Sequence, residues 1–162
     1  MNEPPLAFFI TFTVYGTFLQ GDSRWWQQRA DGHRPPQPLL EHWHQSRLKH
    51  PIQLLNTAQQ SAVQEESARL CEYRHWKHWI TNARSNHVHV VVGAGDTEGV
   101  RVRDQIKANC TRVLREQWIS FRDRPVWTTG GSCRHLFEEA ELERAILYCG
   151  EVQDRKGRDA EK

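Results

Sequence analysis

Runs of apolar residues predict three β-strands in the chain before residue 94. Aromatic and β-branched residues dominate Leu6–Val14, as is typical of a strand. A second strand is expected near Arg74–Ala83, and a third follows it in the run Asn86–Gly93. Only the short turn Arg84–Ser85 separates these two, so they are predicted to pair as a β-hairpin.

Three other segments have the composition or the spacing of helices. Residues 57–70 are rich in Gln, Glu, Ala and Ser, and they follow a capping residue at Asn56 or Thr57. Residues 100–118 and 138–153 each place apolar residues on one stripe of a helix. The first stripe is Val102, Ile106, Cys110, Val113 and Leu114, and the second is Leu142, Ala145, Ile146, Cys149 and Val152.

A loop and short strand around Trp127–Phe137 complete the order strand, helix, strand, strand, helix, strand, helix. This order predicts an α+β fold with an antiparallel sheet and helices packed on one face. Residues 1–153 are expected to form a single domain, followed by a charged, disordered tail over residues 154–162. Gly21–Asn56 shows no clean period and is expected to be an irregular excursion, either a surface loop or a lobe that faces the substrate.

Composition adds few constraints. A chain of 162 residues with 38% hydrophobic residues suits one domain with one core. The apolar run after the N-terminus is too short to cross a bilayer and follows no basic segment, which predicts a cytoplasmic protein without membrane association. The four cysteines show no paired spacing, so they are predicted to be reduced thiols of the core: Cys71, Cys110, Cys133 and Cys149.

Two histidines in the third strand are the strongest chemical signal. Side chains alternate between the faces of a strand, so His87 and His89 should project from one side and Val88, Val90 and Val92 from the other. If the valines meet the helices, the histidines lie on the open face of the sheet. Such a pair is half of a divalent metal site, although two polar residues on a half-exposed strand would show the same pattern.

The last predicted helix carries a tyrosine and two polar residues that could complete such a site. Tyr148 is the only tyrosine that follows the histidines in the sequence. Glu151 and Gln153 come about one turn later, and either could supply an oxygen to a metal.

Together these residues resemble the single-tyrosine HUH transposases of small bacterial insertion sequences and the related REP-associated tyrosine transposases. The likeness rests on the histidine–hydrophobic–histidine strand and on the helix that carries Tyr148. Residues 8–19 look like the family's first strand and the loop after it, and residues 126–132 look like the stretch before its tyrosine helix. The resemblance covers residues 5–153.

The resemblance implies a ferredoxin-like or RRM-like HUH endonuclease fold and a metal-dependent enzyme. Tyr148 would attack single-stranded DNA, leaving a 5′-phosphotyrosine and a free 3′-hydroxyl, and the conserved bond energy would allow rejoining without a nucleotide cofactor. His87 and His89 would hold Mg²⁺ or Mn²⁺. The substrate would be single-stranded or hairpin DNA, cleaved by a homodimer that exchanges the tyrosine helix, as in insertion-sequence relatives, or by a single chain.

The third metal ligand departs from the family pattern, because Val152 stands where a Gln, His or Asn is expected four residues after the tyrosine. In a straight helix Glu151 lies about 60° from Tyr148 and Gln153 about 140° away, which favours Glu151. A bulge at Gly150 would turn Gln153 toward the metal instead, and the resemblance favours Gln153.

Recognition of DNA would need basic and aromatic side chains. Between Val100 and Phe137 there are eight basic residues against three acidic ones, a surplus that fits a phosphate backbone or an ordinary solvated helix face. The candidates for DNA contact are Arg122, Arg124, Trp127, Tyr15 and Arg24, with core packing as the alternative for any tryptophan. His42 and His44 repeat the one-apart spacing and are a weaker candidate for a second metal site.

Three other classes fit parts of the pattern. A domesticated DNA-binding module would keep the fold and lose cleavage, yet binding alone has no use for a tyrosine nucleophile. A small RNA-binding sheet protein should present aromatic residues where this strand presents histidines. A zinc hydrolase with a similar histidine pair usually needs a barrel of about 250 residues, which is longer than this chain.

Overall fold

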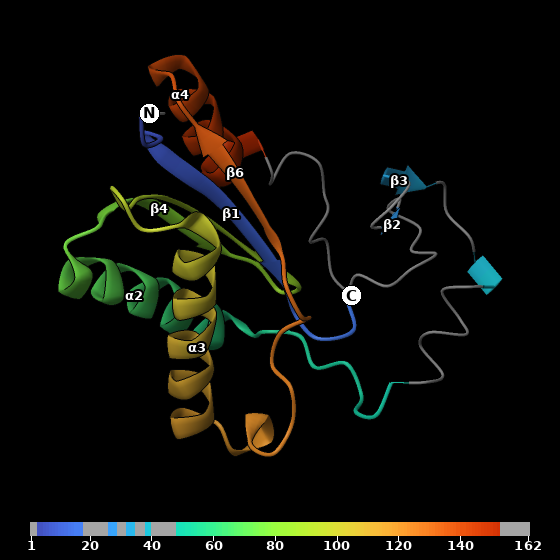
Figure 1. The fold of residues 1–162 in the computed structure, drawn as a ribbon. Helices are drawn as coiled ribbons and strands as arrows, with labels where there is room; N and C mark the ends of the chain where they lie inside the picture. Colours follow the sequence, from blue (N-terminus) through green and yellow to red (C-terminus); the bar gives the residue numbers. More distant parts are fainter. Residues whose placement is uncertain (1–2, 18–25, 29–31, 35–37, 40–47, 153–162) are drawn as a thin grey trace.

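The computed structural model describes residues 3–17, 26–28, 32–34, 38–39 and 48–152 (Figure 1). The strands are β1 (Ala7–Thr13), β2 (Trp26–Gln28), β3 (Gly32–Arg34), β4 (Lys77–Ala83), β5 (His87–Gly93) and β6 (Ser132–Leu136). The helices are α2 (Thr57–Arg74), α3 (Gly99–Gln117) and α4 (Glu139–Leu147), with a 3₁₀ turn at Ile119–Phe121 and a π-helix at Tyr148–Val152.

Four strands form one sheet in the order β4-β5-β1-β6, and every neighbouring pair is antiparallel. The predicted α+β class and antiparallel sheet are therefore confirmed, as is the hairpin between β4 and β5. β1 lies between β5 and β6, which places Thr11 beside His89 on one side and Ser132 on the other. Within the irregular segment, β2 and β3 pair as a small separate ribbon.

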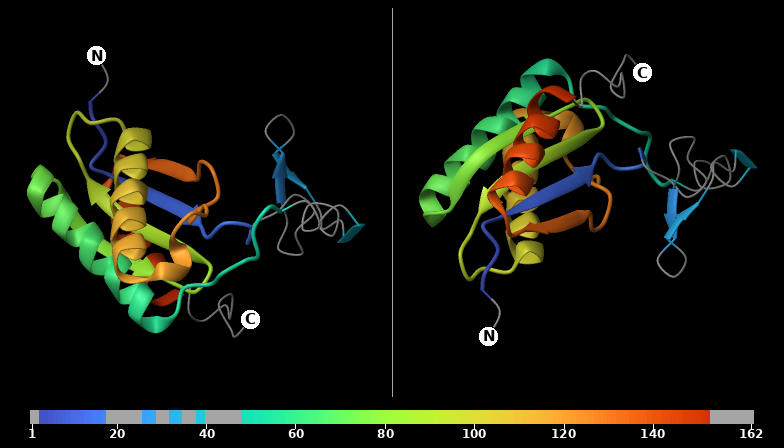
Figure 2. Two further views of the ribbon diagram at one scale, coloured as in Figure 1. Left: turned by 90° about the horizontal axis from the view of Figure 1, so that it is seen from below. Right: turned by 90° about the horizontal axis from the view of Figure 1, so that it is seen from above.

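One face of the sheet is covered by α2 and α3, and the predicted apolar stripe of α3 is buried against it (Figure 2). The larger core cluster joins Val88, Val90 and Val92 of β5 to Phe12 of β1 and to the buried stripe of α3. The α3 members of that stripe are Val102, Ile106, Cys110 and Leu114. The valines therefore face the helices, as their alternation along the strand required.

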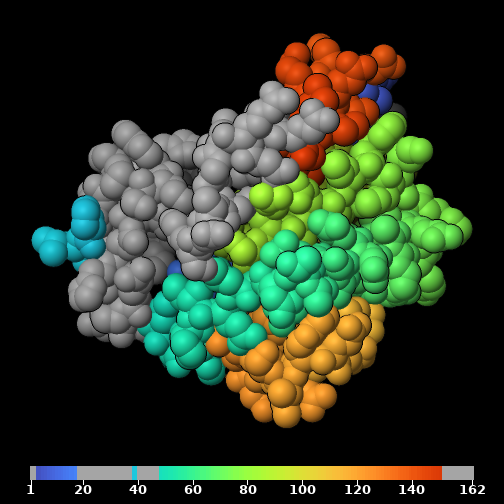
Figure 3. All heavy atoms as spheres, turned by 180° about the vertical axis from the view of Figure 1, so that it is seen from behind, coloured from blue at the N-terminus to red at the C-terminus, as the bar shows by residue number. Residues whose placement is uncertain are grey.

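The opposite face differs from the sequence expectation, because α4 crosses it (Figure 2). Leu142, Ala145 and Cys149 form a second cluster with Val91 and Ala7 on this side of the sheet. The open face expected for the histidines is therefore wrong. The apolar stripe of α4 is buried against the apolar residues that this face carries beside the histidines. From behind, the surface of α4 adjoins β4, and α2 lies between β4 and α3 (Figure 3).

α2 begins at a capping box. The Asn56 side chain accepts a hydrogen bond from the Gln59 backbone N–H at 2.8 Å, and the Gln59 side chain accepts one from the Asn56 N–H at 2.9 Å. The helix runs one turn beyond the predicted Leu70 and ends at Arg74, where His75 adopts a left-handed conformation with φ 60°.

Replacing Asn56 by Ala should destabilise the fold by about 1 kcal/mol, because the side-chain oxygen that accepts the Gln59 backbone N–H is lost. Urea denaturation followed by circular dichroism measures the change. Ser61→Ala, an exposed change inside α2, is the matched control and should not lower stability. An Asn56→Ala protein as stable as the wild type would contradict the role of this cap.

Candidate active site

β5 brings the two histidines together. The ring centroids of His87 and His89 lie 4.7 Å apart at 70°, and the two residues are 8% and 6% exposed. Buried imidazoles need polar partners, because an apolar surrounding does not replace lost hydrogen bonds to water. The structure supplies those partners from two neighbouring segments.

A side-chain oxygen holds each ring at Nδ1. Thr11 Oγ1 lies 2.8 Å from His89 Nδ1, across the β1–β5 pair, and Asn86 Oδ1 lies 2.7 Å from His87 Nδ1. Since an amide oxygen only accepts, His87 donates from Nδ1, and this tautomer carries its lone pair on Nε2. Histidines that bind metals are commonly held in this way, with the second ring nitrogen engaged by an oxygen.

Tyr148 lies beside this pair. Its ring centroid is 5.8 Å from that of His89 at 67°, and 6.0 Å from that of Phe9 at 75°. Phe9 in turn stacks on His89, with centroids 5.2 Å apart and planes at 21°. The structure therefore brings together three of the predicted site residues, His87, His89 and Tyr148, and Phe9 contacts two of them, His89 and Tyr148.

The backbone after Tyr148 is tied to the histidine strand. The Asn82 side chain donates to the Cys149 carbonyl at 2.5 Å, and the Cys149 thiol contacts the His89 carbonyl at 3.6 Å. Burial raises the pKa of this thiol to about 12, so it remains protonated. Asn82 lies opposite His89 in the β4–β5 pair, so the same cross-strand row supports both the histidine and the tyrosine turn.

The third-ligand candidates are not placed by the described structure. The straight helix assumed for Glu151 is wrong, because Tyr148–Val152 forms a π-helix rather than an α-helix. The Glu151 side chain and all of Gln153 lie outside the described residues, as do Arg24, His42, His44 and the predicted tail. Within the described part of the chain, no group of three or more His, Cys, Asp or Glu residues could hold a metal ion.

Trp127 is a core residue, which corrects its assignment as a DNA-contact candidate. It is 8% exposed, packs edge-on against Phe12 at 4.8 Å, and donates from Nε1 to the Lys107 carbonyl at 3.2 Å. A single bridge to Val14 holds it beside β1, so it closes the core between β1 and α3.

Tyr15 and Arg124 are brought together, with the guanidinium 5.8 Å from the ring centroid. Their loops meet because the Tyr15 N–H donates to the Val126 carbonyl at 3.0 Å. The adjacent Val14 N–H donates to the Asn86 carbonyl at 2.9 Å, so this end of the sheet is also the histidine end. Both residues stay candidates for DNA contact.

Several of the basic residues between Val100 and Phe137 donate hydrogen bonds to backbone carbonyls, most of them in the loop after α3. Lys107 donates to the carbonyls of Thr128 and Gly130 at 2.9 and 2.7 Å, and Arg115 donates to the Arg124 carbonyl at 2.7 Å. Arg122 donates to the Arg115 carbonyl at 3.0 Å. These residues line open grooves of about 450 Å³ along α3, on the side of the sheet away from the histidines.

Four supporting residues were not predicted from the sequence: Phe9, Thr11, Asn82 and Asn86. Phe9 and Thr11 are two residues apart and so lie on the same face of β1. A polar residue in the middle of this apolar strand was the one signal in the sequence that could have pointed to Thr11. What it touches depends on the pairing of β1 with β5, which joins residues 78 positions apart.

The fold and site define an α+β protein with a buried histidine pair beside a half-buried tyrosine. No model of a known protein family matches the chain, and no curated protein matches it. Among the described helices, none combines the length and apolar character needed to cross a membrane.

Proposed function

We propose that this protein is a tyrosine HUH transposase, a metal-dependent enzyme that cleaves and rejoins single-stranded DNA. The observation that carries the proposal is the contact of Tyr148 with His89, the ring of a histidine pair whose Nδ1 atoms are both held by side-chain oxygens. A nucleophile next to a metal-binding pair is the arrangement that attack on a phosphodiester needs.

The residues fit a divalent ion. Their held Nδ1 atoms direct His87 and His89 to bind through Nε2, and the buried pair lies close enough to share one ion. When bound, Mg²⁺ or Mn²⁺ would neutralise charge on a non-bridging phosphate oxygen. The π-helix at Tyr148–Val152 departs from the straight helix that favoured Glu151. We therefore propose Gln153 as the third ligand, with Glu151 as the alternative.

Tyr148 would supply the covalent step. Its phenolic oxygen loses a proton and forms a bond to phosphorus, while the bond from phosphorus to the 3′-oxygen breaks and that oxygen gains a proton. The products are a 5′-phosphotyrosine and a 3′-hydroxyl. One phosphodiester is exchanged for another, so the reverse attack by a 3′-hydroxyl can rejoin the strand without a nucleotide cofactor.

The predicted partner is single-stranded DNA, folded in part as a hairpin, and the predicted compartment is the cytoplasm. Tyr15 and Arg124 at the histidine end of the sheet are candidates to contact that DNA. A homodimer that exchanges the tyrosine helix and a single acting chain are both compatible with the proposal.

The proposal predicts a covalent protein–DNA complex. Purified protein is incubated with a pool of single-stranded hairpin oligonucleotides and Mn²⁺, and denaturing electrophoresis reports a protein band shifted by attached DNA. We expect the band with Mn²⁺ and its loss with EDTA. DNA binding without any covalent band would instead favour the non-cleaving DNA-binding module.

A further inference from the structure

Arg134 of β6 is a cation beside the candidate active site that the proposed chemistry does not use. It pairs with Phe9 in the β1–β6 register, on the same face of the sheet as the histidines. Its guanidinium lies 5.8 Å from the centroid of the Phe9 ring, and that ring also contacts His89 and Tyr148. Arg134 is therefore one aromatic ring away from both the histidine and the nucleophile.

The charge of Arg134 is not neutralised within the described part of the chain, where it forms no ion pair with an acidic side chain. Other arginines differ: Arg103 pairs with Asp104 at 3.0 Å, and Arg112 pairs with Glu66 at 3.2 Å. An exposed guanidinium presents a planar fork of donors that matches a phosphate.

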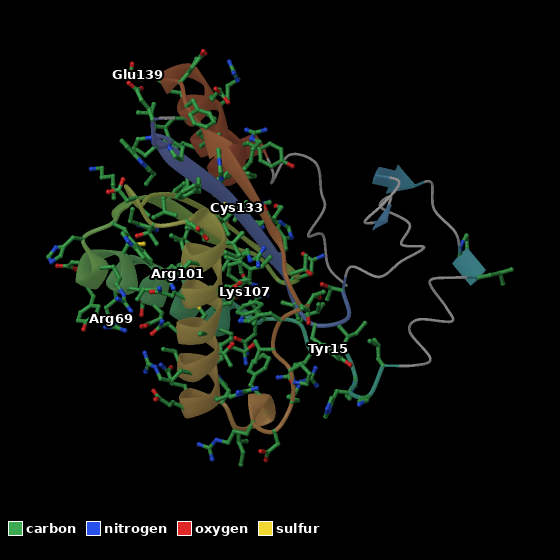
Figure 4. The ribbon with its side chains drawn as sticks, viewed as in Figure 1. Tyr15, Arg69, Arg101, Lys107, Cys133 and Glu139 are labelled. Carbon is green, nitrogen blue, oxygen red and sulfur yellow. The ribbon has the colours of Figure 1, made fainter. Side chains whose placement is uncertain are left out.

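Its place in the sheet gives a strand of DNA room to reach it. β6 is an edge strand, and Arg134 is exposed on it. Lys77 is a second cation on this face, but it pairs with Gly93 at the end of β5 away from His87. Lys107 projects from α3 on the other side of the sheet (Figure 4). Of these three cations, Arg134 is the one that lies a single aromatic ring from Tyr148.

We propose that Arg134 binds a phosphate of single-stranded DNA next to the phosphate that Tyr148 attacks, so that the strand passes over Phe9 toward β6. This inference rests on the proposed function, since it assumes the same substrate. Each bound phosphate releases counterions, so a lost contact appears in the salt dependence of binding.

The test measures binding alone. Fluorescence anisotropy follows a labelled single-stranded hairpin oligonucleotide across a NaCl series, with EDTA present and Tyr148→Phe as the parent protein. We expect the slope of log K against log salt to become shallower by about 0.7 in Arg134→Gln. Arg134→Lys should keep the parent slope because it keeps the charge.

Arg101→Gln is the matched control, because it removes the same charge from an exposed position of α3, across the sheet (Figure 4). It should keep the parent slope. An unchanged slope in Arg134→Gln would overturn the inference. An equal change of slope in Arg101→Gln would overturn it too, as would a parent protein that binds no hairpin oligonucleotide at low salt. A lower melting temperature with an unchanged slope would reduce Arg134 to a structural partner of Phe9.

The two proposals fail separately. The anisotropy series needs no cleavage. The absence of a covalent band would therefore count against the proposed function, while the salt slope would still show whether Arg134 binds a phosphate. An unchanged slope together with a metal-dependent covalent band would reject the role of Arg134 and keep the transposase.

Discussion

Tyr148→Phe should abolish the covalent protein–DNA complex. The substitution removes one oxygen and keeps the ring that packs against His89 and Phe9, so the fold and the histidine pair should survive. Without the phenolic oxygen no bond to phosphorus can form, and we expect at least about a 1,000-fold loss of complex formation, the scale seen when a nucleophile is removed. Denaturing electrophoresis under the Mn²⁺ conditions measures the loss.

Tyr73→Phe is the matched control. Tyr73 lies near the end of α2 and is 71% exposed, far from the contacts of the histidine pair. This variant should form the covalent complex at the wild-type rate. A Tyr148→Phe protein that still forms the complex would show that another residue is the nucleophile, and the proposed function would lose its central assignment.

His89→Ala should remove metal binding. His89 lies between Tyr148 and His87, and its Nδ1 is held by Thr11, so the substitution deletes one of two imidazole donors. We expect Mn²⁺ affinity to fall at least about 100-fold, beyond the effect usual for a supporting residue, and the covalent complex to disappear with it. Titration of free Mn²⁺ by electron paramagnetic resonance measures the affinity, and thermal melting shows whether the variant is folded.

Two other variants serve as comparisons for His89→Ala. Thr11→Val removes the oxygen that holds His89 and should weaken Mn²⁺ binding about 10- to 100-fold while leaving both histidines in place. His135→Ala removes an exposed histidine of β6 and should change nothing. A folded His89→Ala protein with wild-type Mn²⁺ affinity would mean that the pair is a structural feature of the sheet.

Local periodicity determined most of the secondary structure. Strand alternation placed His87 and His89 on one side of β5 and Val88, Val90 and Val92 on the other, and the stripe of α3 marked its buried face correctly. These predictions hold because side-chain direction within one element follows from backbone geometry alone. The capping residue Asn56 and the hairpin turn are local signals of the same kind.

Local periodicity could not predict the contacts between segments that are distant in the sequence. Nothing in the stripe of α4 says which face of the sheet it will cover, so the histidines were expected in the open and are instead buried. Trp127 could be a stacking platform or a core residue, and only the packing of α3 against β1 decides for the core.

The sequence by itself determined that a histidine pair, a tyrosine helix and an α+β sheet occur in this chain. The tertiary structure decided that Tyr148 meets His89, that Thr11 and Asn86 hold the two rings, and that Arg134 lies across Phe9 from the site. The physical reason is that strand register and helix docking are set by the packing of the whole core, whereas periodicity reports only the direction of each side chain within its own element.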